Sequence, residues 1–159
     1  MAFHTVLSAS IQGLHVEMVH VEADVSNGLP VFHMVGYLSS EVKEASERVR
    51  TAIRNAGIQI PARKVVVNLA PATVRKKGAS FDLPIALAVM AALGEIEGEK
   101  LERTLVIGEL GLDGRVQEVP GILPMLLEAR KAGCRACILP IRNAPEGALV
   151  DGIRILGVR

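Results

Sequence analysis

The order of predicted strands and helices constrains the fold of this chain more than any other feature. Apolar alternation predicts strands over residues 3–11 and 14–25, and a third strand over 30–35 follows the turn signal Asn27-Gly28. Further elements are predicted over residues 39–56 (helix), 64–70 (strand), 81–93 (helix), 105–110 with 115–119 (hairpin), 122–132 (helix), 136–139 (strand), 143–149 (short helix) and 153–158 (strand). A block of strands followed by alternating helices and strands favours an α+β or mixed α/β fold, with the helices packed on one sheet.

Two details of the opening strands carry separate predictions. The apolar alternation slips by one residue between Met18 and Val19, which indicates either a bulge or a strand buried on both faces. The turn at Asn27-Gly28 predicts that the first three strands form a β-meander.

The segment after residue 39 has the clearest helical pattern. Apolar residues recur at helical spacing from Val42 to Ala56, Ser39 or Ser40 can cap the start, and Gly57 is the expected stop. Glu44 and Arg48 lie at i,i+4, where an ion pair contributes roughly 0.3 kcal/mol.

Composition limits the classes of function. The chain has 159 residues, half of them hydrophobic, which is enough for one compact domain without disulfides or metals. With 18 Lys and Arg against 17 Asp and Glu, no global field attracts nucleic acid or an anionic membrane, so any such binding must be local. Three Phe, one Tyr and no Trp leave few platforms for base stacking.

The chain gives no sign of secretion, membrane insertion or metal binding. It lacks a signal-peptide pattern, and its longest apolar stretch, residues 83–93, is too short to cross a bilayer. We therefore expect a soluble cytoplasmic protein. Cys134 and Cys137 form a lone Cys-x-x-Cys, which predicts two reduced, packed cysteines, with a metal or redox site as the alternative.

The sequence also lacks a nucleotide-binding loop. A P-loop requires Gly-Lys followed by Ser or Thr, and no Gly-Lys dipeptide occurs in the chain. Gly108, Gly111 and Gly114 have the wrong spacing for a dinucleotide fingerprint. This segment is expected to hold no ATP and no other cofactor.

Several blocks in order along the chain carry a family resemblance. They are Ser26–Pro30, Val35-Gly36, Val42–Glu44, Glu47–Arg50, Val67–Ala72, Phe81–Ala86, Gly108–Leu110 with Asp113-Gly114, and Ile138–Pro140 with Asn143-Ala144. Together they resemble the N-terminal, Lon-protease-like domain of the magnesium-chelatase-like AAA+ ATPases of the ComM (YifB) group. The resemblance implies a fold of the ribosomal-protein-S5-domain-2 type, with residues 1–159 as a single Lon-like domain. It also implies a downstream AAA+ domain, absent from this chain, that uses ATP and Mg and forms a homo-oligomeric ring, and a role in handling DNA as a branch-migrating motor in natural transformation.

The resemblance to Lon assigns two positions of the protease site. Lon-type proteases use a Ser nucleophile and a Lys base. Gly78-Ala79-Ser80 matches the nucleophile segment, and the alignment of Gly114-Arg115-Val116 and Gly121-Ile122 puts Leu123 at the lysine position. An apolar side chain accepts no proton, so the resemblance implies a broken dyad and no catalytic residue. Ser80 alternatively reads as a helix N-cap.

Basic residues offer the candidate binding site. Arg75, Lys76 and Lys77 form the densest basic run, and Arg63 and Lys64 flank it in sequence. Such clusters contact DNA backbones, while the alternative is a solvated loop with exposed charges. Lys76 and Lys77 could in principle also replace the missing base for Ser80.

These observations predict a non-catalytic accessory domain. It would contact DNA or assist ring assembly for a ComM-type ATPase, with its own AAA+ domain, the ring and DNA as partners. The alternatives are a protein-interaction module of a true magnesium-chelatase-type ATPase and a residual Ser peptidase.

Overall fold

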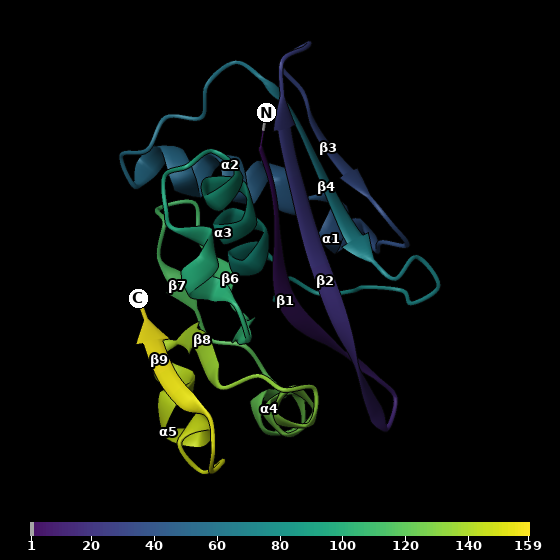
Figure 1. Ribbon diagram of the computed structural model, residues 1–159, viewed down its shortest axis with the longest axis vertical. Coiled ribbons are helices and arrows are strands. Elements are labelled where there is room, and N and C mark those ends of the chain that lie inside the picture. The colour runs from purple at the N-terminus through teal and green to yellow at the C-terminus, as the bar shows by residue number, and fades with distance from the viewer. Residues whose placement is uncertain (1) are drawn as a thin grey trace.

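The computed structural model describes residues 2–159 as one seven-stranded mixed sheet with helices on both faces, and a separate two-stranded ribbon (Figure 1). The order in the sheet is β3-β4-β2-β1-β5-β8-β9. The strands are β1 (Ala2–Gln12), β2 (His15–Ser26), β3 (Phe32–Val35), β4 (Lys64–Ala70), β5 (Thr104–Val106), β6 (Glu109–Leu110), β7 (Val116–Gln117), β8 (Ala136–Pro140) and β9 (Arg154–Val158). The helices are α1 (Ser40–Lys43), α2 (Ala45–Asn55), α3 (Asp82–Ala92), α4 (Ile122–Lys131) and α5 (Ala144–Gly147), with 3-10 turns at Gly98–Leu101 and Ile141–Asn143.

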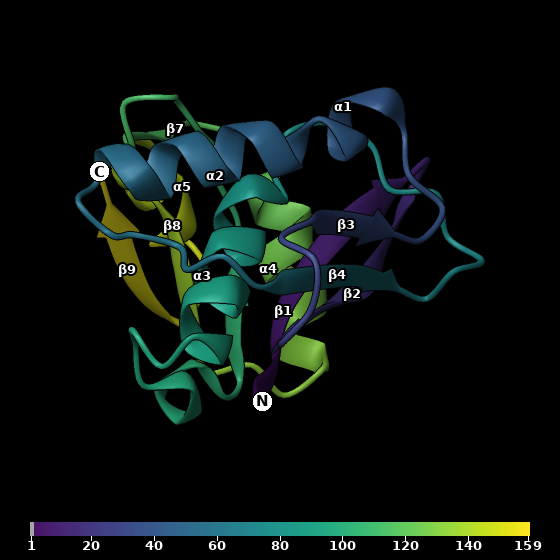
Figure 2. The ribbon, with the colours of Figure 1, turned by 90° about the horizontal axis from the view of Figure 1, so that it is seen from above.

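The predicted α+β class is confirmed, and the core lies in two parts on opposite faces of the sheet. The larger part packs α2 and α3 against residues such as Val21 and Val67. The smaller part packs α4 against residues such as Ala9 and Leu105. In Figure 2, α2 runs across the upper end of α3, and the two helices contact each other.

The slip of alternation in β2 comes from burial on both faces. The β1–β2 register runs without interruption from Ala2–Val25 to Gln12–His15, so no bulge is present. Val19 and Val21 belong to the larger core, whereas Met18 packs against the smaller one below α4. The strand therefore changes its buried face where α4 replaces α3 as its cover.

The predicted meander is wrong, because β4 lies between β2 and β3. It pairs antiparallel with β2 and parallel with β3. The alternate residues Val65, Val67 and Leu69 of β4 are fully or almost fully buried, which suits an interior strand. Strand β3 exposes His33 and Val35 and forms an edge of the sheet.

The first predicted helix is present but divided at Glu44 into α1 and α2. Ser39 caps α1 as predicted, because its Oγ accepts a hydrogen bond from the backbone N–H of Val42 at 3.3 Å. Gly57 follows the end of α2 with a φ of +89°, as expected of a C-terminal stop.

Two other predicted elements differ in detail. The segment predicted as one strand over 105–110 divides into β5, which enters the main sheet, and β6, which pairs with β7. The Asn143 side chain does not cap α5. It donates to the carbonyl of Val119 at 2.9 Å and accepts from the Val119 N–H at 3.0 Å, joining α5 to the segment before α4.

Cys134 and Cys137 are free, buried and part of the smaller core, which confirms their packing role. Burial raises the pKa of the Cys137 thiol to about 12. Among residues 2–159 no cluster of three or more His, Cys, Asp or Glu is placed to hold a metal ion. The helices in this range are all too short or too polar to cross a membrane.

Candidate functional site: the Ser80 pocket and the basic residues

Ser80 lies in a pocket at the turn before α3, between β1, the 77–81 loop and the segment that leads into α4. The pocket has a volume of about 180 Å³. Its lining residues are Ala9, Ser10, Ile11, Lys77, Gly78, Ala79, Ser80, Phe81, Glu109, Val119, Pro120 and Met125. The carbonyl of Ser80 accepts a hydrogen bond from the Gly108 N–H at 3.0 Å, which fixes the turn against the end of the sheet.

The interpretation of Ser80 as a helix cap is wrong. Phe81 is the N-cap residue of α3, and no side chain donates or accepts a capping hydrogen bond there. The Ser80 side chain is half-buried and lines the pocket instead. The position assigned by the resemblance to Lon is therefore a serine that lines a pocket.

Among its lining residues, the Ser80 pocket has no buried lysine. Leu123 is half-buried against the smaller core and is not among the lining residues; α4 contributes Met125 to the pocket. Lys77 lines the pocket but is exposed, whereas a lysine base is normally desolvated. Within residues 2–159 the Ser80 hydroxyl makes no hydrogen bond to another side chain.

Lys76 is fully buried, contrary to its prediction as an exposed charge. Its Nζ donates to the carbonyl of Pro71 at 2.6 Å. Its backbone N–H donates to Tyr37 O at 2.8 Å, and its carbonyl accepts from Ser39 N at 2.9 Å. These backbone hydrogen bonds hold Lys76 against the segment before α1, with its side chain buried. Burial lowers the pKa of the Lys76 amine.

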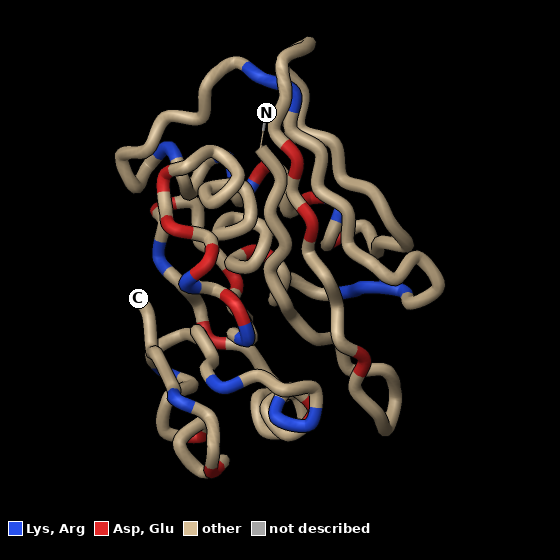
Figure 3. Tube along the Cα trace, viewed as in Figure 1, with Lys and Arg blue, Asp and Glu red and all other residues tan. Residues whose placement is uncertain are grey.

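The other basic residues do not form one patch. Arg75 and Lys77 are exposed on the loop after β4, while Arg63 and Lys64 lie where β4 begins. A strand of this length separates the two groups by roughly 20 Å. Figure 3 shows them as distinct blue segments of the tube. The sequence predicted that Arg63 and Lys64 act together with the basic run at residues 75–77. Strand β4 lies between the two groups and keeps them apart.

A buried ion pair was missed by the sequence analysis. Asp82 is fully buried at the start of α3, and Arg48 of α2 holds it with two hydrogen bonds, Nε to Oδ2 at 2.8 Å and Nη2 to Oδ1 at 3.0 Å. The Leu110 N–H also donates to Asp82 Oδ2 at 3.1 Å. The predicted partner of Arg48, Glu44, lies 3.9 Å away and is largely exposed. A carboxylate inside an apolar run was the signal that could have revealed the pair.

The pKa values of this pair follow from burial and from the hydrogen bonds. Burial raises the pKa of Asp82, and the Arg48 guanidinium and the Leu110 N–H act against that rise. The hydrogen bond to Asp82 raises the pKa of Arg48. The pair connects α2, α3 and β6 directly behind the turn that carries Ser80.

The comparison with known families agrees with the magnesium-chelatase-like resemblance of the sequence motifs. The sequence model described as subunit ChlI of Mg-chelatase matches residues 21–143, well over half of the chain. The chain belongs to this family. The match runs from within β2 to the end of the 3-10 turn before α5, so it includes Ser80, the Arg48–Asp82 pair and both groups of basic residues, while the β1 residues that line the Ser80 pocket precede it.

Proteins named ComM and YifB are among the relatives of this chain. The chain is 43% identical over its whole length to an uncharacterized protein of Mycobacterium tuberculosis, of which it covers 32%. It is 39% identical over 95% of its length to the competence protein ComM of Haemophilus influenzae, of which it covers 30%. The chain thus spans about a third of the length of these relatives.

Two more distant relatives have other names. The chain is 28% identical over 86% of its length to a Lon protease of Mycolicibacterium smegmatis, covering 18% of that protein. It is 35% identical over 67% of its length to the DNA repair protein RadA of Escherichia coli, covering 22% of that protein. The first match agrees with the Lon-like α+β fold.

Proposed function

We propose that this chain is a non-catalytic accessory domain of a ComM-type AAA+ ATPase, and that it contacts DNA for the motor. The observation that carries the non-catalytic part is the lining of the Ser80 pocket: its one lysine, Lys77, is exposed, and α4 contributes Met125. The buried Lys76 is not among the lining residues, and its Nζ donates to the Pro71 carbonyl. The Lon scaffold is retained around a site without its general base.

The DNA part is supported by the names of relatives. One similar protein is a competence protein and another is a DNA repair protein. Under this proposal, the ATP and Mg of the motor would be bound outside residues 1–159, which contain no Gly-Lys dipeptide for a P-loop. A magnesium-chelatase-type motor is the alternative parent, and the family description supports that alternative.

A serine-reactive fluorophosphonate tests the non-catalytic assignment. We expect no more labelling of the native chain than of the Ser80→Ala variant, because a serine hydroxyl without a base is a weak nucleophile. Labelling that disappears in Ser80→Ala would instead establish a residual serine hydrolase.

A role in ring assembly is the second candidate, and one observation favours it. Strand β9 is an edge of the sheet, and Leu149, Leu156 and Ile141 near it are exposed at 73%, 39% and 42%. An exposed edge with apolar neighbours can pair with another chain. Sedimentation of the chain alone checks this: concentration-dependent self-association that Leu149→Glu abolishes supports assembly, and a monomer at all concentrations argues against it.

A further inference from the structure

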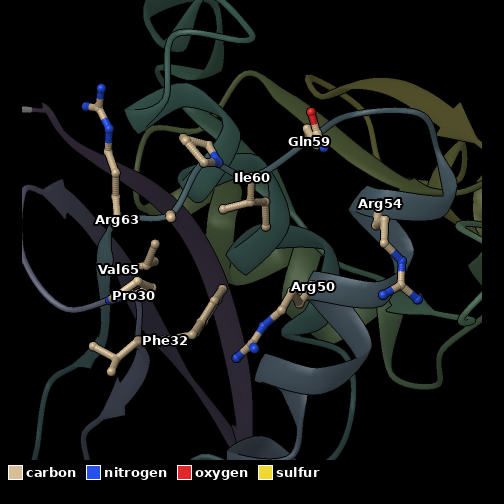
Figure 4. Close-up of a pocket in the computed structure, with 11 residues that line it drawn as sticks. Pro30, Phe32, Arg50, Arg54, Gln59, Ile60, Arg63 and Val65 are labelled. Atoms are coloured by element: carbon tan, nitrogen blue, oxygen red, sulfur yellow. The ribbon is translucent and has the colours of Figure 1, made fainter.

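A second pocket, larger than the Ser80 pocket, lies between α2, β3 and the loop that precedes β4 (Figure 4). It has a volume of about 350 Å³, within the range of small-ligand sites. Its lining residues are Pro30, Val31, Phe32, Arg50, Arg54, Gln59, Ile60, Pro61, Ala62, Arg63 and Val65. We call this site the arginine pocket.

The charge of the arginine pocket is of one sign. Arg50, Arg54 and Arg63 contribute three guanidinium groups, and none of its lining residues, all within the described range, is Asp or Glu. Arg54 and Arg63 are exposed. Arg50 forms an ion pair with Glu47 at 3.7 Å, but both side chains are more than half exposed, so a ligand can displace it at little cost. A cluster of arginines without acidic residues favours an anion, and the guanidinium fork matches phosphate oxygens.

The floor of the pocket is apolar. Phe32 and Ile60 are half-buried, Val65 is buried, and the Arg50 guanidinium carbon lies 5.7 Å from the centre of the Phe32 ring. Figure 4 shows Arg50 reaching toward Phe32 from α2, Arg54 on the same helix, and Arg63 on the opposite rim. A ligand that fits both features has an anionic group for the rim and a flat apolar group for the floor.

We infer that the arginine pocket binds single-stranded DNA, with one base on the Phe32–Arg50 floor and flanking phosphates on Arg54 and Arg63. A base can enter a recess only when it is unstacked, which excludes regular duplex, and aromatic and arginine side chains are the usual platforms for unpaired bases. This inference rests on the proposed DNA role. It adds that the DNA is single-stranded and that it binds at the arginine pocket. It places the contact at the start of β4, about 20 Å from the predicted loop at Arg75 and Lys77.

Fluorescence polarisation with a labelled oligothymidylate of about 12 nucleotides at low salt tests the site. We expect Arg54→Glu/Arg63→Glu to weaken binding by at least about tenfold, because two attractive charges become repulsive. Arg135→Glu/Arg142→Glu makes the same change of net charge at exposed positions outside the pocket and should weaken binding by less than about threefold. Phe32→Leu keeps an apolar side chain but removes the ring and should weaken binding by about fivefold or more. Thermal unfolding of each variant verifies that it is folded.

The possible outcomes separate this inference from the proposed function. If Arg75→Glu/Lys77→Glu abolishes binding while Arg54→Glu/Arg63→Glu leaves it intact, the site is overturned and the DNA role stands. If the native chain binds no oligothymidylate at low salt, the DNA role itself fails. Displacement of the oligonucleotide by a poly-glutamate peptide, but not by excess duplex, would reassign the pocket to an acidic protein segment and overturn the inference.

Discussion

At the scale of single residues, the Arg48–Asp82 pair carries the strongest prediction for stability. Arg48→Ala leaves the Asp82 carboxylate buried without its bidentate partner. We expect the free energy of unfolding to fall by about 3–5 kcal/mol near neutral pH. Urea unfolding measures the loss, and Arg142→Ala, at an exposed position, should change stability by less than about 0.5 kcal/mol.

The same variant should respond to pH in a defined direction. Burial already raises the pKa of Asp82, and loss of Arg48 removes the main influence that lowers it. A group whose folded-state pKa is raised keeps its contribution to stability below the unfolded-state pKa and loses it as pH rises through the folded-state pKa. The deficit of Arg48→Ala should therefore be small in acid and grow toward neutral pH. A deficit that stayed constant across this range would mean that Asp82 titrates no differently without Arg48.

Lys76 predicts a substitution that stabilises the chain. Its ammonium is buried with the Pro71 carbonyl as its hydrogen-bond partner, and burial lowers its pKa. Replacing a buried charge by an apolar side chain of similar length is often stabilising, so Lys76→Met should raise the free energy of unfolding by about 1 kcal/mol near neutral pH. A lowered pKa means that the native protein recovers stability as pH rises, so the advantage of Lys76→Met should shrink in alkaline solution.

Lys77→Met is the matched control for this prediction, because Lys77 is the exposed neighbour. It should change stability by less than about 0.5 kcal/mol. A loss of stability in Lys76→Met would show that the hydrogen bond to Pro71 outweighs the cost of burying the charge.

At the scale of elements, Asn143 connects two parts of the chain that share no strand ladder. Its amide satisfies both the N–H and the carbonyl of Val119, and both residues are buried. Asn143→Ala leaves these two groups unpaired and should lower the free energy of unfolding by about 2–4 kcal/mol. Asn55→Ala removes a single exposed bond to Leu112 and should cost roughly 0.5 kcal/mol in the same urea titration. Equal losses in the two variants would contradict the role assigned to Asn143.

Local pattern predicted where most helices and strands lie, but neither the division of two of them nor the partners of the strands in the sheet. The strand at 64–70 and the buried helix before Gly94 follow from apolar runs with defined ends, and both are present within a residue of their predicted bounds. The place of β4 between β2 and β3 was not predictable, because pairing depends on packing between residues some 40 positions apart, as in Asp24 with Val66. The turn signal at Asn27-Gly28 predicts that the chain reverses there, but it does not determine which strand pairs with β2.

The sequence identified functional residues that belong to one short motif, such as the segment around Ser80. It did not identify sites that form only when several helices, strands and loops come together. The segment around Ser80 was singled out by its resemblance, and the structure places it in a pocket. The inward direction of Lys76 is set by backbone bonds to residues 37 and 39, which composition does not reveal. The arginine pocket joins α2 to a loop and to β3, so its residues are scattered over 36 positions from Pro30 to Val65.

At the scale of the whole molecule, net charge sets the expected salt dependence. The formal net charge is +1, so a strong dependence on salt cannot come from the overall field. Single-stranded DNA releases about 0.7 counterion per neutralised phosphate, and the two arginines assigned to phosphates, Arg54 and Arg63, predict a slope of log K against log salt of about −1.4. Arg54→Glu/Arg63→Glu should reduce this slope toward zero, whereas Arg135→Glu/Arg142→Glu should preserve it. A slope steeper than about −4 would require phosphate contacts well beyond the arginine pocket, because three cations cannot release that many counterions.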